Sequence, residues 1–178
     1  MLNKILVCLD GSRFAEGVLP FAIERANRFN SKIILLHVIN SPMATYLASA
    51  PAIAGQSMPI IAQPNLDLLI REEEKKDKSY LDRTVVRLNK IGLDAEFTTR
   101  RRTAGETIGD TIIHYASECK ADLIMMAIHK RSFWRRFIFG SVTESVIRKS
   151  ASPVLVVNPR SHRARVQSLE TLPQPSPV

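Results

Sequence analysis

Residues 121–157 read ADLIMMAIHKRSFWRRFIFGSVTESVIRKSASPVLVV, and they carry the clearest fold signal in the chain. The runs 121–128 and 153–157 are short and apolar, which is typical of strands buried on both faces of a parallel sheet. Gly140 stands before a segment, residues 141–150, that we expect to form a helix. A strand, a helix and a second strand in this order predict a parallel βαβ unit.

The same alternation extends toward the amino terminus. Apolar runs at residues 4–9 and 32–39 predict two further buried strands, and a fifth strand is expected at residues 95–99. Helices are expected between them, at residues 13–29, 66–91 and 105–119. Five strands alternating with helices predict an α/β fold of three layers, with helices on both faces of a five-stranded, mainly parallel, doubly wound sheet.

Size and composition fit one domain. The chain has 178 residues, 45% of them hydrophobic, which suffices for a single well-packed core. We expect the domain to span residues 1–158 and the Pro-rich tail, residues 159–178, to be disordered. Residues 40–65 carry no charge, but Pro, Ser, Thr and Gln interrupt them, so we expect a mobile or partner-contacting loop rather than a membrane span.

The number of cysteines indicates the redox environment in which the protein works. Cys8 and Cys119 are too few for a disulfide framework or a four-ligand zinc site, and they indicate a reduced environment. The apolar run before Asp10 is too short for a secretory signal. We therefore expect a cytoplasmic protein.

The net charge of +8 is concentrated in three short patches, at residues 100–102, 130–136 and 160–165. The rest of the chain has 15 basic and 17 acidic residues, so its own charge is slightly negative. Such a basic excess fits nucleic acid, anionic lipid or phosphate ligands, and it also fits plain solubility.

Parallel sheets bind ligands beyond the carboxyl ends of their strands. That edge should hold Asp10 and residues 38–40, 100–102 and 127–130. The spacing of Ser141 and Glu144 predicts a capping box at the start of a helix, whose first N–H groups attract anions. A capped helix without any ligand explains the same motif.

The sequence resembles the universal stress protein family over about residues 2–158. The matching stretches are ILVCLDGS with Asp10, LLHVI, Gly105-Glu106 before a helix, and residues 121–157. The family's phosphate loop is Gly-x-x-Gly-x9-Gly-Ser/Thr, and the nine residues between Lys130 and Gly140 keep its spacing.

The resemblance implies an adenine nucleotide alpha hydrolase-like fold, a homodimer paired through the last strand at residues 153–157, and binding of ATP or another adenine nucleotide with Mg²⁺. It implies a stress-response regulatory module. By position, Asp10 and Val38 would border the adenosine, with Cys8 near the base. The full set of candidate binding residues is Cys8, Asp10, Val38, Met126, Ala127, His129, Lys130, Arg131, Gly140, Ser141, Val142 and Thr143.

Two loop glycines of that pattern are replaced here. Ala127 adds one methyl group, whereas Lys130 would cost about 1–2 kcal/mol if its position needs a positive φ. Two outcomes follow: the loop is remodelled and binds no nucleotide, or Lys130 and Arg131 replace backbone donors as phosphate ligands.

An alternative function uses residues 130–137, where four cations surround Trp134. This basic-aromatic loop could bind an acidic protein partner, nucleic acid or an anionic membrane. Phe137 and Phe139 could equally be core residues beside a solvated loop. Arg100 and Arg102, on one face of a strand, could add to an anion site or lie in a solvated turn.

Catalysis has little support in the sequence. The four histidines lie on different elements without metal-ligand spacing, and His37 in a buried strand is expected to be a hydrogen-bonded core residue. Ser12 and Ser141 both have the sequence context of helix caps. We expect a binding protein rather than an enzyme, with slow ATP hydrolysis left open.

Overall fold

The computed structural model describes residues 2–39, 63–103, 105–128 and 140–159, except that the side chains of residues 63–70 and 73 are not described. The expectations for residues 40–62, for the basic-aromatic loop 130–137 and for the tail beyond residue 159 therefore lie outside the described residues.

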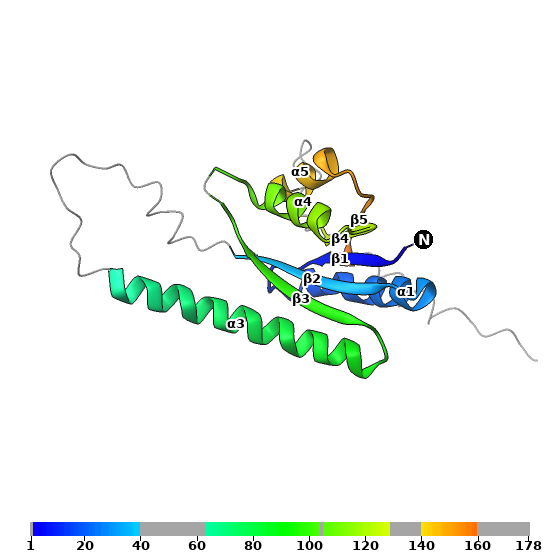
Figure 1. Ribbon diagram of the computed structural model, residues 1–178, viewed down its shortest axis with the longest axis horizontal. Helices are drawn as coiled ribbons and strands as arrows, with labels where there is room; N and C mark the ends of the chain where they lie inside the picture. Colours follow the sequence, from blue (N-terminus) through cyan, green and yellow to red (C-terminus); the bar gives the residue numbers. More distant parts are fainter. Residues whose placement is uncertain (1, 40–62, 104, 129–139, 160–178) are drawn as a thin grey trace, which may run out of the picture.

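A five-stranded parallel sheet forms the centre of the molecule, in the order β3-β2-β1-β4-β5 (Figure 1). This confirms the predicted doubly wound α/β fold, with β1 as the first strand and later strands added on both sides. The strands are β1 (Lys4–Cys8), β2 (Lys32–Ile39), β3 (Ala95–Arg101), β4 (Leu123–Ala127) and β5 (Val154–Val157). The helices are η1 (Ala15–Val18), α1 (Leu19–Phe29), α3 (Gln63–Lys90), α4 (Ile108–Glu118) and α5 (Ser141–Lys149).

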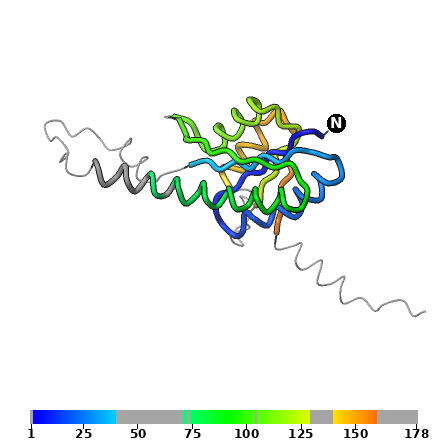
Figure 2. Tube along the Cα trace, turned by 60° about the horizontal axis from the view of Figure 1, so that its bottom comes forward, coloured from blue at the N-terminus to red at the C-terminus, as the bar shows by residue number. Residues whose placement is uncertain are grey.

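Helices cover the two faces of the sheet in pairs: α1 and α3 lie on one face, and α4 and α5 on the other (Figures 1 and 2). Along β1, Ile5 and Val7 are buried under α1 and α3, whereas Leu6 is buried under α4 and α5. Successive residues of a strand point to opposite faces, so a strand covered on both sides must be apolar throughout. The continuous apolar runs of the sequence have this cause.

The first predicted helix is divided in the structure. Residues 13–29 were expected to form one helix, but a 3₁₀ turn, Ala15–Val18, precedes α1. Pro20 lies in the first turn of α1, where its missing N–H group breaks no helical hydrogen bond. Ser12 was expected to be the N-cap, but Phe14 occupies that position of the 3₁₀ turn. Oγ of Ser12 instead accepts from the N–H of Ala15, the first residue of the turn, at 3.0 Å.

α3 is longer than the strands that it covers. Its 28 residues span about 42 Å, whereas the eight residues of β2 span about 26 Å. The helix ends before Gly92, whose φ of +86° lets the chain turn into β3. Its amino-terminal part consequently extends past the carboxyl edge of the sheet (Figures 1 and 2).

None of the described helices combines the length and the apolar composition that a membrane-crossing segment requires.

Candidate functional site

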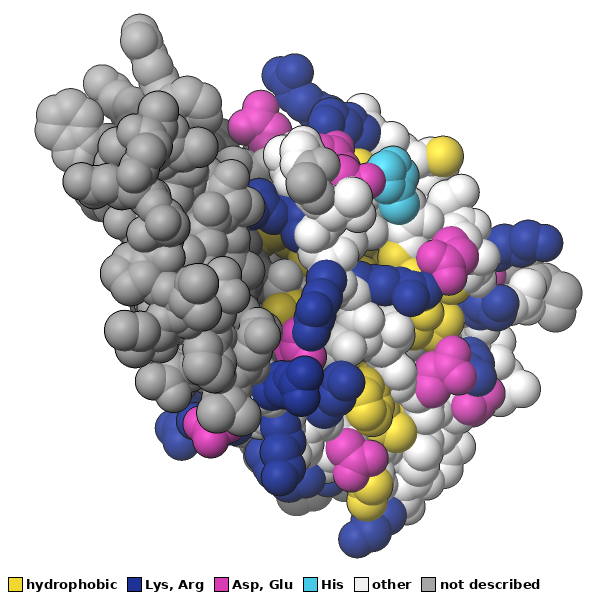
Figure 3. All heavy atoms as spheres, turned by 60° about the vertical axis from the view of Figure 1, so that its left-hand side comes forward, with side chains coloured by type: hydrophobic (Ala, Val, Ile, Leu, Met, Phe, Trp, Pro, Cys, Tyr) yellow, Lys and Arg dark blue, Asp and Glu magenta, His cyan; other side chains and the backbone are white. Residues whose placement is uncertain are grey.

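A pocket of about 510 Å³ lies at the carboxyl edge of the sheet. The ends of β1, β2 and β4 form its floor, and the first turns of α4 and α5, together with α3, form its sides. This is the edge at which the topology of a doubly wound sheet places ligands. Figure 3 shows the molecule from this side, where basic and acidic side chains lie close together on the described surface.

The pocket has two unlike walls. One wall is apolar and continues the core under α4 and α5. Its side chains are Cys8, Leu36, Val38, Ile108, Ile112, Met126 and Val142. The other wall lies toward α1 and α3 and carries the polar groups Asp10, His37 and Asp77. The described part of the pocket therefore suits a ligand with a flat apolar portion and hydroxyl groups beside it.

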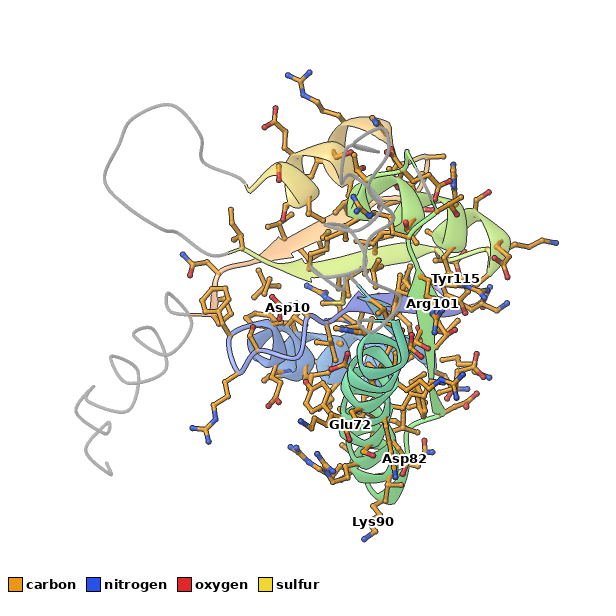
Figure 4. The ribbon with its side chains drawn as sticks, turned by 90° about the vertical axis from the view of Figure 1, so that its left-hand side faces the viewer. Asp10, Glu72, Asp82, Lys90, Arg101 and Tyr115 are labelled. Carbon is orange, nitrogen blue, oxygen red and sulfur yellow. The ribbon has the colours of Figure 1, made fainter. Side chains whose placement is uncertain are left out.

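Asp10 lies two residues after the end of β1, at the mouth of the pocket (Figure 4). Gly11 follows with a φ of +79°, which turns the chain sharply. The N–H of Ser12 then donates to Oδ1 of Asp10 at 2.9 Å. This local turn fixes the carboxylate while leaving its second oxygen to accept a further hydrogen bond.

His37 is buried, and both of its ring nitrogens have partners. Nδ1 lies 2.9 Å from the carbonyl oxygen of Leu9, and Nε2 lies 3.2 Å from Oδ2 of Asp77. The prediction of a hydrogen-bonded core histidine is confirmed. The same ring also lines the pocket, so the residue is part of the candidate site as well as of the core.

Cys8 belongs to the apolar wall. Its withdrawal from water raises the pKa of its thiol to about 12. The thiol therefore stays protonated at physiological pH, which disfavours its use as a nucleophile.

The start of α5 differs from its prediction. Ser141 was expected to cap this helix in a capping box with Glu144, but Gly140 occupies the N-cap position, and no side chain of the described residues caps the helix. Ser141 is the first helical residue, and Glu144 pairs instead with Arg148 at 3.3 Å. The N–H groups of this first turn are thus left for an acceptor outside the helix.

The capping box of the structure belongs to α4. Thr107 Oγ1 accepts from the N–H of Asp110 at 3.1 Å, and Oδ2 of Asp110 accepts from the N–H of Thr107 at 3.0 Å. A second oxygen of Asp110 accepts from Nζ of Lys149 at 2.7 Å. These hydrogen bonds hold the pKa of Asp110 well below its usual range.

The arginines of β3 are engaged away from the pocket. Arg100 lies over the ring of Tyr115, 4.5 Å from its centroid, and pairs with Glu118 at 2.5 Å. Arg101 points to the opposite face, where it pairs with Glu74 of α3 (Figure 4). Neither these residues nor Arg102 is among the residues that line the pocket. Their predicted contribution to an anion site at this pocket is therefore not seen.

The structure brings together many of the predicted site residues. The pocket lining includes Cys8, Asp10, Val38, Met126, Ala127, Val142 and Thr143. Gly140 and Ser141 precede Val142 at the start of α5. His129, Lys130 and Arg131 lie outside the described residues.

The sequence interpretation missed the contribution of α3. Asp77 of this helix lines the pocket beside His37, but it is not among the candidate residues that the sequence predicted. The helical period could have revealed this role, because Asp77 lies on the same side of the helix as the buried residues Leu81, Thr84 and Leu88. A charged residue on the buried side of α3 must face the sheet.

Among the described residues, no group of three or more His, Cys, Asp or Glu side chains is arranged to hold a metal ion.

A doubly wound sheet with a pocket at its carboxyl edge and an uncapped helix at that pocket is typical of α/β proteins that bind small ligands. The model of the Universal stress protein family matches residues 1–158. The chain therefore belongs to the universal stress protein family.

Relatives in bacteria and archaea are similar over nearly their full length. The stress response protein NhaX of Bacillus subtilis is 27% identical, with 87% of this chain and 97% of the relative covered. Universal stress protein MJ0577 of Methanocaldococcus jannaschii is 28% identical over 88% of this chain and 95% of its own length.

Solved structures of the family share the fold. That of MJ0577 superposes with a TM-score of 0.63 at 25% identity, covering 89% of this chain and 96% of the other. A universal stress protein of Archaeoglobus fulgidus in complex with dAMP superposes with a TM-score of 0.58 at 24% identity, covering 89% and 100%. A further universal stress protein was solved in complex with cAMP, with a TM-score of 0.57 at 21% identity, covering 89% and 98%.

Proposed function

We propose that this protein is a stress-response regulatory module that binds an adenine nucleotide, such as ATP, in the pocket at the carboxyl edge of the sheet. The observation that carries the proposal is the pairing of an apolar wall with a carboxylate wall, closed by the uncapped first turn of α5.

Each part of a nucleotide has a complementary part of the site. The base fits the apolar wall beside Val38 and Met126. The ribose hydroxyls can donate to Asp10. The phosphates belong at the start of α5, where Ser141 to Thr143 offer backbone N–H groups and the positive end of the helix dipole. Phosphates do not belong beside Asp10 and Asp77, because like charges repel.

Structures of the same fold support this assignment, since two of them are complexes with cAMP and dAMP. Both ligands combine adenine, a sugar and a phosphate group.

The site is proposed to be degenerate. Ala127 lines the pocket at the end of β4, where a glycine would leave the backbone open to a phosphate. Lys130 replaces a second loop glycine and, with Arg131, would supply side-chain charge to the phosphates. We therefore expect binding weaker than that of a complete glycine loop, with Mg²⁺ shared between the phosphates and solvent.

The module is proposed to be regulatory rather than enzymatic, and cytoplasmic. A protonated Cys8 and a carboxylate held in a tight turn at Asp10 are suited to contact a ligand and not to attack it. We also propose a homodimer paired through β5, which is an edge strand of the described sheet. An edge strand offers unpaired N–H and C=O groups to a second chain.

The decisive experiment changes the charge at the start of α5. Among the described residues, a methyl group built on Gly140 meets no atom within 4 Å, and the φ of −65° suits any residue, so Gly140→Asp and Gly140→Ala both fit. Asp is a favoured N-cap, so its carboxylate should occupy the N–H groups without destabilising the helix.

Wild type and Gly140→Ala should gain melting temperature with millimolar ATP and Mg²⁺ in differential scanning fluorimetry, and Gly140→Asp should not. The proposal is wrong if the wild type shows no shift and equilibrium dialysis detects no bound nucleotide.

An alternative is that the protein binds an acidic partner, nucleic acid or an anionic membrane through the basic-aromatic loop 130–137, without any nucleotide. This alternative rests on the sequence, because the loop lies outside the described residues. Salt-sensitive binding that is lost in the double variant Arg135→Glu and Arg136→Glu would favour it.

A further inference from the structure

α3 is held to the sheet in two different ways along its length. In its carboxyl-terminal half, Leu81 and Leu88 are buried in the core, with Tyr80 and Val85 packed beside them. From Arg71 to Ser79, by contrast, every residue is polar or charged. Among the described side chains of α3, apolar burial therefore fixes residues 80–90 and not residues 71–79.

Among the described side chains, two polar contacts join residues 71–79 to the sheet. Oδ2 of Asp77 lies 3.2 Å from Nε2 of His37, and Oε1 of Glu74 lies 2.5 Å from Nη2 of Arg101. The Arg101 side chain is 68% exposed and the Glu74 side chain 12%, and Oε1 of Glu74 has no hydrogen-bond partner among the described residues. The His37 side chain is 11% exposed and the Asp77 side chain 32%. Each contact thus joins a buried side chain to a more exposed one, and the contact of Asp77 is the one that lies in the pocket wall.

The surroundings of His37 determine how its protons are placed. The carbonyl of Leu9 can only accept a hydrogen bond, so Nδ1 must carry a proton. Nε2 then faces a carboxylate, which is also an acceptor, and the contact is a hydrogen bond when this nitrogen is protonated too. A continuous chain of contacts thus runs from the end of β1 through His37 to α3.

This chain lies in the wall of the ligand pocket, since Leu9, His37 and Asp77 all line it. We propose that Asp77 is a positioning residue of the site: through His37 it holds residues 71–79 of α3 as a wall of the pocket, and it thereby couples pocket occupancy to the position of this part of the helix. The choice of an adenine nucleotide as occupant rests on the function proposed above.

Occupancy favours the docked helix for a physical reason. A ligand shifts a conformational equilibrium only by interacting differently with its two states. A nucleoside in the pocket contacts the polar wall when α3 is docked, and it excludes the water that competes for the His37–Asp77 contact. Ligand binding should therefore change how firmly α3 is held against the sheet, and α3 extends past the edge of the sheet (Figure 2).

The positioning role can be tested without any ligand, by hydrogen–deuterium exchange of the backbone amides. Asp82 is the matched control, because it lies on the same helix, carries the same charge and is exposed (Figure 4). Asp77→Ala should raise exchange at residues 71–79 roughly tenfold and leave residues 81–90 protected, since local openings follow local contacts. Asp82→Ala should change neither segment.

Asp77→Asn serves as a second variant, because its amide can donate to Nε2 of a neutral ring and should restore part of the protection. Equal exchange of residues 71–79 in Asp77→Ala and Asp82→Ala would overturn the positioning role.

The coupling is tested by adding AMP while calorimetry records how much is bound. Bound AMP should slow exchange at residues 71–79 in the wild type and in Asp82→Ala, but not in Asp77→Ala, whose affinity should fall several-fold. Unchanged exchange with AMP demonstrably bound would overturn the coupling. Absence of AMP binding to the wild type would instead overturn the proposed function and the coupling together, and the ligand-free comparison would still decide the role of Asp77.

Discussion

α4 and α5, the two helices on one face of the sheet, begin in opposite ways. α4 begins at Thr107, whose hydroxyl and the carboxylate of Asp110 satisfy each other's backbone N–H groups. α5 begins at Gly140, which has no side chain to offer. Both starts border the same pocket, through Ile108 of α4 and Val142 of α5. At the start of α4, side chains of the helix itself accept from its first backbone N–H groups. At the start of α5, these N–H groups are left for a ligand.

The two helices are also in direct contact, and this contact allows the strongest perturbation. A methyl group built on Gly109 of α4 would lie 2.8 Å from Cβ and from Oγ of Ser145 on α5. Gly109→Leu should therefore push the helices apart and destabilise the fold by about 1–3 kcal/mol, the usual cost of overpacking. Chemical denaturation measures this cost.

Gly140→Ala is the matched control, because no atom of the described residues lies within 4 Å of its added methyl group. An equal loss of stability in the two variants would contradict the close packing of α4 on α5.

A smaller effect is expected at the α4 cap. Thr107→Ala removes the hydroxyl that accepts from the N–H of Asp110 and should destabilise the protein by about 1 kcal/mol. Thr107→Ser keeps this acceptor and should stay close to the wild type. A change in nucleotide affinity larger than the change in stability would contradict the assignment of this start as purely structural.

Sequence patterns identified the elements of this fold better than they identified helix starts. The limits of β2 were predicted from its apolar run, because burial on both faces demands that pattern. The capping box was assigned to Ser141 and Glu144, although Thr107 and Asp110 fit a similar spacing. Both pairs are compatible with a cap, and only the backbone conformation at Gly140 decides which residue enters the helix first.

The sequence did not predict the full polar wall of the pocket, and the reason differs from that for the helix starts. Asp10, at the end of a strand, was found from topology, but His37 and Asp77 acquire their role only when α3 lies against β2. The phase of a long, highly charged helix determines which of its acids face the sheet. Asp77 could have been found from its spacing to Leu81 and Leu88, whereas its distance to His37 depends on the packing of two elements that are distant in sequence.

The smallest effect is expected from the charge of Asp110 at acid pH. The folded state holds the pKa of this carboxyl below its ordinary value near 4, through Lys149 first and then Thr107. A lowered pKa means that the contribution to stability is present above the ordinary value, and that it is lost as the pH falls below about 4. Asp110→Asn keeps an acceptor for the N–H of Thr107 but removes the charge.

Thermal denaturation between pH 2 and pH 7 should therefore show a smaller loss of stability on acidification in Asp110→Asn than in the wild type. The difference should be modest and should shrink in high salt, because Lys149 is 57% exposed and its pairing is screened. Parallel pH profiles for the two proteins would mean that the capping of α4 depends on the Thr107 hydroxyl and not on the charge of Asp110. The starts of α4 and α5 would then differ in their hydrogen bonds and not in their charge.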